Sequence, residues 1–106
     1  MIQAKYTVEE NTHSITVLGH ATYNEHGTDI VCAGVSAIVQ ALVGWIENNS
    51  EYAERVSVGL RSGEALIECI GGENVAAVFF MTAIGLEQIA DTYPDQVQIE
   101  IIGLAD

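Results

Sequence analysis

Apolar and polar residues alternate in several short stretches of the chain, with the period of two expected when one face of a β-strand is buried. This alternation predicts strands over residues 2–9 and 14–19, joined by a hairpin turn in "ENTH". Two further strands over residues 53–61 and 65–70 flank the turn "SGE", and residues 97–102 predict a last strand. His13 belongs to the first hairpin turn, where we expect it to be exposed.

A helical period replaces the alternation in two longer segments. The first begins after Asp29 and ends at "NNS", with its apolar positions at Val31, Val35, Ile38, Val39, Leu42, Val43 and Ile46. The second covers residues 75–93 and ends before Pro94, which cannot donate the next backbone hydrogen bond. The "GGEN" before it predicts a turn and helix start, because it lacks the lysine of a phosphate-binding loop.

The second helix is apolar on almost every side, so we expect it to lie centrally or at a subunit interface. Its "FFM" cluster, residues 79–81, is assigned to the core or to a dimer interface. The order ββαββαβ predicts an α+β sandwich of two helices on a mainly antiparallel sheet. With 106 residues and no break in composition, we expect one domain over residues 1–106.

The composition of the chain indicates in which compartment the protein is expected. The hydrophobic fraction of 49% is enough for a folded core. The N-terminus has no apolar signal-peptide region, and the longest apolar stretch, Val75 to Leu86, is shorter than the roughly 20 residues that cross a bilayer. We therefore expect a soluble, cytoplasmic protein without a membrane span, whose two cysteines remain thiols.

Acidic residues dominate the charge. Only Lys5, Arg55 and Arg61 oppose 15 acidic residues, which leaves a formal net charge of -12. Such a surface repels nucleic acid and anionic lipid, so neither is expected as a direct partner. It favours encounter with a basic polypeptide, although solubility alone would also explain the charge.

The candidate chemistry gathers in one segment, "GHATYNEHGTDIVCAGVS", residues 19–36. Residues 20–28 show no periodicity, so we expect a mobile loop around Gly27 that closes on a substrate. Asp29 is the expected N-cap of the following helix. Cys32 would then lie in the first turn, where the helix dipole stabilises a thiolate and unpaired amides face a carbonyl oxygen. His20, at the end of the preceding strand, is a candidate general base.

This segment resembles the signature of the ribosomal-processing cysteine protease family, Prp. The residues that carry the resemblance are Gly19, His20, Ala21, Gly27, Asp29, Ile30, Val31, Cys32, Ala33 and Ser36. The resemblance implies a cytoplasmic, dimeric endopeptidase that trims an N-terminal extension from a large-subunit ribosomal protein, a basic substrate. We expect no cofactor and no metal.

The resemblance also implies residue roles, with Cys32 as nucleophile and His20 as general base and then acid. Asp29 and Ser36 would be supporting residues. From the residues alone, Asp29 acts mainly as the helix cap. Ser36 either holds a water or substrate backbone with its hydroxyl, or is a small residue that permits close packing.

Other interpretations of the same residues stay open. Cys32 could be a small core residue, or His20, His26 and Cys32 could be three ligands of a zinc site. The whole chain could be a non-catalytic acidic module that binds a ribosomal protein during ribosome assembly. Cys69 lies in a strand pattern and is assigned a structural role, and Tyr23 and His26 are candidate substrate contacts.

Overall fold

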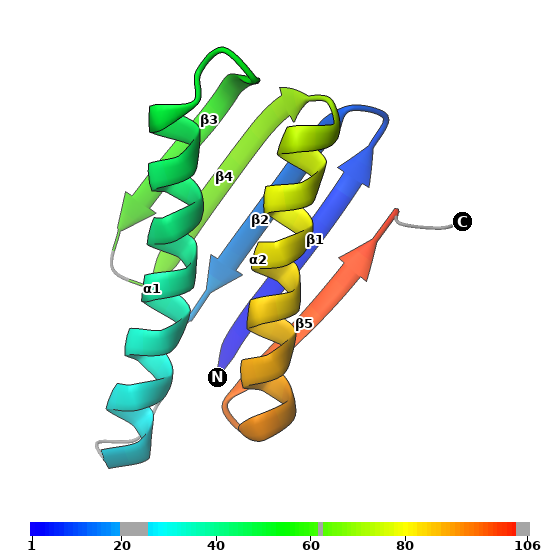
Figure 1. The fold of residues 1–106 in the computed structure, drawn as a ribbon. Helices are drawn as coiled ribbons and strands as arrows, with labels where there is room; N and C mark the ends of the chain where they lie inside the picture. Colours follow the sequence, from blue (N-terminus) through cyan, green and yellow to red (C-terminus); the bar gives the residue numbers. More distant parts are fainter. Residues whose placement is uncertain (20–25, 62, 104–106) are drawn as a thin grey trace.

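The computed structural model describes residues 1–19, 26–61 and 63–103, together with the side chains of these ranges except at 26–29, 55 and 56. Its elements in chain order are β1 (Ile2–Glu9), β2 (Thr12–Leu18), α1 (His26–Asn48), β3 (Ala53–Arg61), β4 (Glu64–Gly71), α2 (Glu73–Thr92) and β5 (Val97–Ile102). This order confirms the ββαββαβ prediction (Figure 1).

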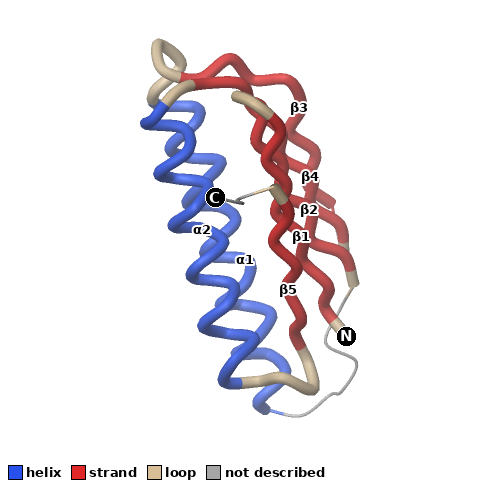
Figure 2. The backbone as a smooth tube through the Cα atoms, turned by 90° about the vertical axis from the view of Figure 1, so that its right-hand side faces the viewer, coloured by secondary structure: helices blue, strands red, loops and turns tan. Residues whose placement is uncertain are grey.

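The elements form two layers, with both helices on one face of a single sheet (Figure 2). The sheet has five strands in the order β3-β4-β2-β1-β5. Strand β1 pairs in parallel with β5, and the other neighbouring strands are antiparallel. The predicted α+β sandwich with a mainly antiparallel sheet is therefore confirmed.

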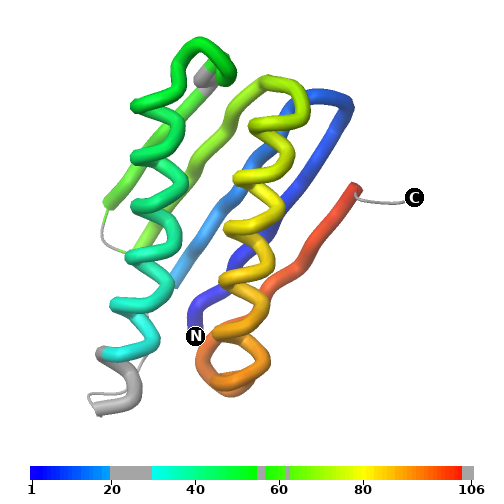
Figure 3. Tube along the Cα trace, viewed as in Figure 1, coloured from blue at the N-terminus to red at the C-terminus, as the bar shows by residue number. Residues whose placement is uncertain are grey.

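The pairing explains why both helices cover the same face. Helix α1 connects two strands that run the same way, β2 and β3, and α2 connects β4 and β5, which also run the same way. These crossovers move in opposite directions across the sheet, but β4 is antiparallel to β2. Two right-handed crossovers therefore place their helices on one side. The helices consequently lie side by side and run antiparallel (Figure 3).

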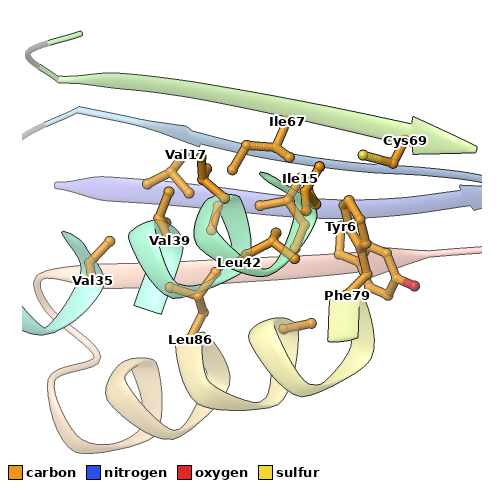
Figure 4. Close-up of a cluster of buried hydrophobic side chains, with 14 of the residues drawn as sticks. Tyr6, Ile15, Val17, Val35, Val39, Leu42, Ile67, Cys69, Phe79 and Leu86 are labelled. Carbon is orange, nitrogen blue, oxygen red and sulfur yellow. The ribbon is translucent and has the colours of Figure 1, made fainter. Parts of the chain in front are cut away.

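The core lies between the sheet and the two helices (Figure 4). Alternate strand residues face inward, and across β2 and β4 the fully buried Ile15 and Ile67 are paired directly. Phe79 and Leu86 of α2 are also fully buried. Each large side chain buried in this way stabilises the fold by about 1.5–3 kcal/mol relative to its exposed state.

Both helices are long and apolar enough to cross a membrane by length and composition alone. The twelve-residue stretch considered in the sequence lies inside the 20-residue α2. Our expectation that its length argues against a membrane span is therefore wrong. Each helix nevertheless packs one face on the sheet and contributes buried residues to the common core. This is also how the core helices of a two-layer fold are arranged.

Helix α1 begins earlier than the sequence predicts. Its first residue is His26, so the prediction of a loop reaching residue 28 and an N-cap at Asp29 is wrong. Gly27 and Asp29 have helical backbone, and Cys32 is the seventh residue, in the second turn. A helix leaves only its first four amides without intrahelical partners, so these belong to residues 26–29, before Cys32.

His13 is buried, contrary to the prediction of an exposed turn residue. It belongs to β2, is 4% exposed and stacks near Tyr6 and Phe79. Its Nδ1 lies 2.9 Å from the Tyr6 hydroxyl oxygen. Burial raises the pKa of Tyr6 to about 12, so its hydroxyl is protonated at neutral pH and shares this hydrogen bond with Nδ1. Burial also lowers the pKa of His13, which favours the neutral imidazole.

We expect this histidine to make the fold less stable in mild acid. Its pKa is lower in the folded chain than the unfolded value of about 6.5, so the unfolded chain binds more protons as the pH falls. The stabilisation of the fold by uncharged His13 is present above the unfolded pKa of about 6.5 and is lost as the pH falls below it. Urea unfolding at pH 7.5 and 5.5 should therefore show a larger loss of unfolding free energy in the natural chain than in His13→Gln, which cannot titrate. Equal losses in the two chains would contradict this account.

Candidate active site

A cavity of about 370 Å³ opens between α1, the end of β2 and the β3–β4 hairpin. It is lined by Ile2, Val17, Gly19, Cys32, Val35, Ser36, Val39, Gln40, Leu60, Arg61, Gly63, Glu64 and Ala65. Its volume is within the usual size range of small-molecule and cofactor sites. The cavity therefore brings together residues that are widely separated in the sequence.

Two of the predicted site residues border this cavity. Cys32 is half-buried and Ser36 is exposed, and both lie on the α1 face that lines the cavity. His20 lies outside the described residues, as does the side chain of Asp29. The structure thus brings Cys32 and Ser36 together, and the positions of the other two predicted groups remain predictions.

The zinc interpretation falls largely on the same undescribed part of the chain. His20 and the side chain of His26 lie outside the description, so two of the three proposed ligands are not placed. Among the side chains that are described, no group of three His, Cys, Asp or Glu residues could hold a metal ion. The candidate substrate contact Tyr23 also lies outside the described ranges.

The end of β2 is held in place beside the cavity by Gly19. This residue has a φ of 102°, in the left-handed region, and a Cβ there would lie 2.2 Å from the Met1 carbonyl oxygen. Only glycine fits such a position without strain. The Gly19 amide also donates to the Gly63 carbonyl at 2.8 Å, which ties the strand end to the β3–β4 turn. The backbone is therefore fixed immediately before His20.

The interior of the cavity is apolar. Val35 and Val39 point from α1 toward the sheet, opposite Val17 of β2 (Figure 4). Ala65 pairs with Val17 on one side and with Leu60 on the other, so these three side chains form one row across the sheet. Such a lining favours an apolar side chain of a bound molecule over a charged one.

The mouth of the cavity is polar. Arg61 Nε lies 2.7 Å from Glu64 Oε1 across the hairpin turn. The two side chains are 82% and 47% exposed, so this ion pair adds little to stability. On the helix side, Gln40 Nε2 donates to Ser36 Oγ at 3.1 Å. Polar groups at the rim with an apolar interior suit a peptide, whose backbone needs hydrogen bonds and whose side chains can be apolar.

Sequence reasoning missed several of these residues. Gln40 lies four residues after Ser36, so the helical spacing that linked Cys32 to Ser36 carried a signal for it. Leu60, Glu64 and Ala65 come from a distant hairpin, and no pattern along the chain connected them with Cys32.

A larger cavity, about 700 Å³, lies at the opposite end of the sheet beside Tyr6 and His13. No cysteine, serine or threonine is among the described residues that line it. The other thiol, Cys69, is fully buried in β4 and belongs to the core, which agrees with the structural role assigned to it. The smaller cavity is therefore the better candidate for cysteine chemistry.

A half-buried thiol at the edge of an apolar cavity, on a two-layer α+β sandwich, is an arrangement suited to a cysteine hydrolase. The family model described as cysteine protease Prp matches residues 1–98. The chain therefore belongs to the Prp family and is a cysteine protease. This assigns an enzyme in place of the non-catalytic module considered above.

Individual relatives agree with this assignment. The chain is 37% identical over 82 residues to the ribosomal processing cysteine protease Prp of Mycoplasma genitalium, covering 76% of this chain and 80% of the relative. The crystal structure of SMU.848 from Streptococcus mutans matches with a TM-score of 0.75 and 26% identity, covering 96% and 94% of the two chains.

The fold is also that of the essential ribosomal processing protease Prp from S. aureus, solved in complex with a covalently linked product peptide. Here the TM-score is 0.80 at 22% identity, with 95% of this chain and 99% of the other covered.

Proposed function

We propose that this protease is an endopeptidase that removes the N-terminal extension of a large-subunit ribosomal protein, with Cys32 as nucleophile and His20 as general base. The observation that carries the proposal is the position of Cys32, half-buried at the edge of the apolar cavity beside Ser36. The relatives named ribosomal processing proteases support the class of substrate. Ribosomal proteins are basic, which suits a chain of net charge -12.

The reaction begins when His20 takes the proton from Cys32 Sγ. The thiolate attacks the carbonyl carbon of the scissile peptide bond, and the carbonyl oxygen becomes an oxyanion. His20 then gives its proton to the leaving amine, the C–N bond breaks and the shortened protein departs, while a thioester joins the N-terminal peptide to Cys32. Water attacks the thioester with His20 again as base, which frees the peptide and restores the thiol.

Two supporting residues complete the proposal. Asp29 lies in the helical backbone near the start of α1, three residues before Cys32, and a negative charge is favourable at that end of a helix. It would orient the His20 imidazole, because a carboxylate placed directly on the thiolate would oppose its charge. Ser36 provides a hydroxyl on the cavity face of α1.

The test is a digest of a ribosomal protein precursor that carries its N-terminal extension. The expected products are one shortened protein and one intact N-terminal peptide, identified by mass, because an endopeptidase cuts a single internal bond. A ladder of products shortened residue by residue, or an uncut precursor bound to the protease, would contradict the proposal. Since ribosomal proteins are made in the cytoplasm, the proposed site of action is cytoplasmic.

We also propose a homodimer formed through the outer face of α2. Ala77, Phe80, Met81 and Ile84 follow one another at helical spacing on the side turned away from the core, and all four are exposed. Met81 is 73% exposed. An apolar stripe of this kind is stabilised when a partner surface removes it from water. Phe79 of the predicted "FFM" cluster is in the core, whereas the two residues after it are exposed.

A charge in this stripe should separate the two copies. Met81→Glu is expected to shift the sedimentation coefficient from the dimer to the monomer value at micromolar concentration, because a carboxylate would be buried at the contact. Gln98→Glu is the matched control, since it adds the same charge at an exposed position of β5, on the sheet face that points away from the helices. A natural chain that sediments as a monomer, or a Met81→Glu variant that stays dimeric, would rule out this interface.

A further inference from the structure

Cys32, Ser36 and Gln40 form a stripe along one face of α1, and each of them lines the cavity. They are spaced by four residues, so each step along the stripe is about 6 Å. In an extended peptide, carbonyl groups on the same side recur every two residues, at about 6.6 Å. A peptide lying along α1 with its scissile carbonyl at Cys32 would therefore bring a second carbonyl oxygen close to Ser36.

The hydroxyl of Ser36 is bonded differently from those of Thr82 and Thr92, the other helical hydroxyl residues whose side chains are described. Thr82 and Thr92 donate to the carbonyls four residues earlier, Val78 and Gln88, at 2.7 and 3.0 Å. This is the usual bond of a helical hydroxyl. Within the described part of the chain Ser36 makes no such bond, and its oxygen instead accepts from Gln40 Nε2 at 3.1 Å. A hydroxyl has one proton to donate, so the proton of Ser36 is available to another acceptor.

We propose that Gln40 is a positioning residue, which turns the Ser36 hydroxyl so that its proton points to a backbone carbonyl of the bound peptide. The amide NH₂ of Gln40 can only donate, and it occupies an acceptor site of the Ser36 oxygen. The proton of the hydroxyl can then go to water in the free protein, because Ser36 is exposed, and to a carbonyl of the peptide when one lies along α1. This inference deepens the proposed function and rests on it, because the peptide is the substrate that Cys32 cleaves.

The polarity of this bond can be reversed with little change of shape. Gln40→Glu replaces the donating amide by a carboxylate, which accepts the Ser36 proton and withdraws it from the substrate. We expect KM for the precursor to rise roughly three- to tenfold with kcat little changed, because one hydrogen bond present in both ground and transition states is lost. Ser36→Ala should raise KM by a similar factor.

The double variant Ser36→Ala/Gln40→Glu separates positioning from other effects. If Gln40 acts only through Ser36, the double variant should have the KM of Ser36→Ala alone. A direct effect of the new charge on the substrate would persist without the hydroxyl. Gln98→Glu is again the matched control and should keep the natural KM. Both positions in α1 are exposed, so circular dichroism should show each variant folded.

The outcomes distinguish this inference from the proposed function. If the natural chain cuts the precursor and Cys32→Ala does not, but Gln40→Glu has the natural KM, the role of Gln40 is wrong and the proposed function stands. If KM in the double variant rose by the product of the two single-variant factors, the positioning role of Gln40 would also be wrong. A natural chain that leaves the precursor uncut would overturn both.

Discussion

Cys32→Ala is expected to abolish cleavage of the precursor, with a fall in kcat of roughly 10³-fold or more. Alanine cannot form the thioester, and no other described thiol borders the cavity. The side chain is half-buried and small, so the free energy of unfolding should change by no more than about 1 kcal/mol. The measurement is the rate of product formation by mass spectrometry, with a urea unfolding curve for each variant.

The chain contains its own matched control in Cys69. This residue is fully buried in β4, and Cys69→Ala should lower stability by about 1 kcal/mol while keeping the cleavage rate of the folded enzyme. Comparable cleavage by Cys32→Ala and the natural chain would remove Cys32 from the reaction. If only Cys69→Ala lost cleavage, at a temperature where this variant is folded, the assignment of Cys32 as the nucleophile would be wrong.

His20→Ala should lower kcat by roughly 10²- to 10⁴-fold, the usual contribution of a general acid–base. Without the imidazole, nothing in the proposal takes the thiol proton or protonates the leaving amine. Added free imidazole should restore part of the rate, because it can diffuse to the space left by the missing side chain. Free imidazole can replace the proton transfer by His20, but it cannot replace a structural contact. Partial recovery of the rate would therefore indicate that His20 acts as a base and acid.

The matched control is the buried His13, at the other end of the sheet. His13→Gln should keep the natural kcat at pH 7.5 and should not respond to imidazole. An unchanged kcat in His20→Ala would exclude His20 as the base. A low kcat that imidazole leaves unchanged would favour a structural role for His20 instead.

Strand β1 shows why alternation predicts a strand, since Ile2, Ala4 and Tyr6 are buried on one face and the residues between them are exposed. The observed bounds of β1, β3 and β5 agree with those predicted from the sequence. The same alternation could have predicted that His13 is buried. It precedes Ile15 and Val17 by two and four residues, so it lies on the same inner face of β2. Its polarity suggested a turn, whereas Tyr6 provides the hydrogen bond that permits burial.

The start of α1 was missed for a different reason. The residues from His26 to Thr28 have no apolar periodicity, because this end of the helix extends beyond the sheet (Figure 1). Hydrophobic spacing reports only the buried face of a helix. The prediction therefore began at the first buried turn, around Val31, and placed Cys32 one turn too close to the helix end.

By itself the sequence determined the order of the elements, the inward faces of the strands and the helical stripe that carries Cys32 and Ser36, because these depend on local periodicity. Only the tertiary structure decided the strand order β3-β4-β2-β1-β5 and the cavity beside Cys32. The far wall of that cavity, with Leu60 and Ala65, comes from a hairpin that α1 reaches through a crossover. Contacts between such distant segments depend on how the layers pack, which no local pattern records.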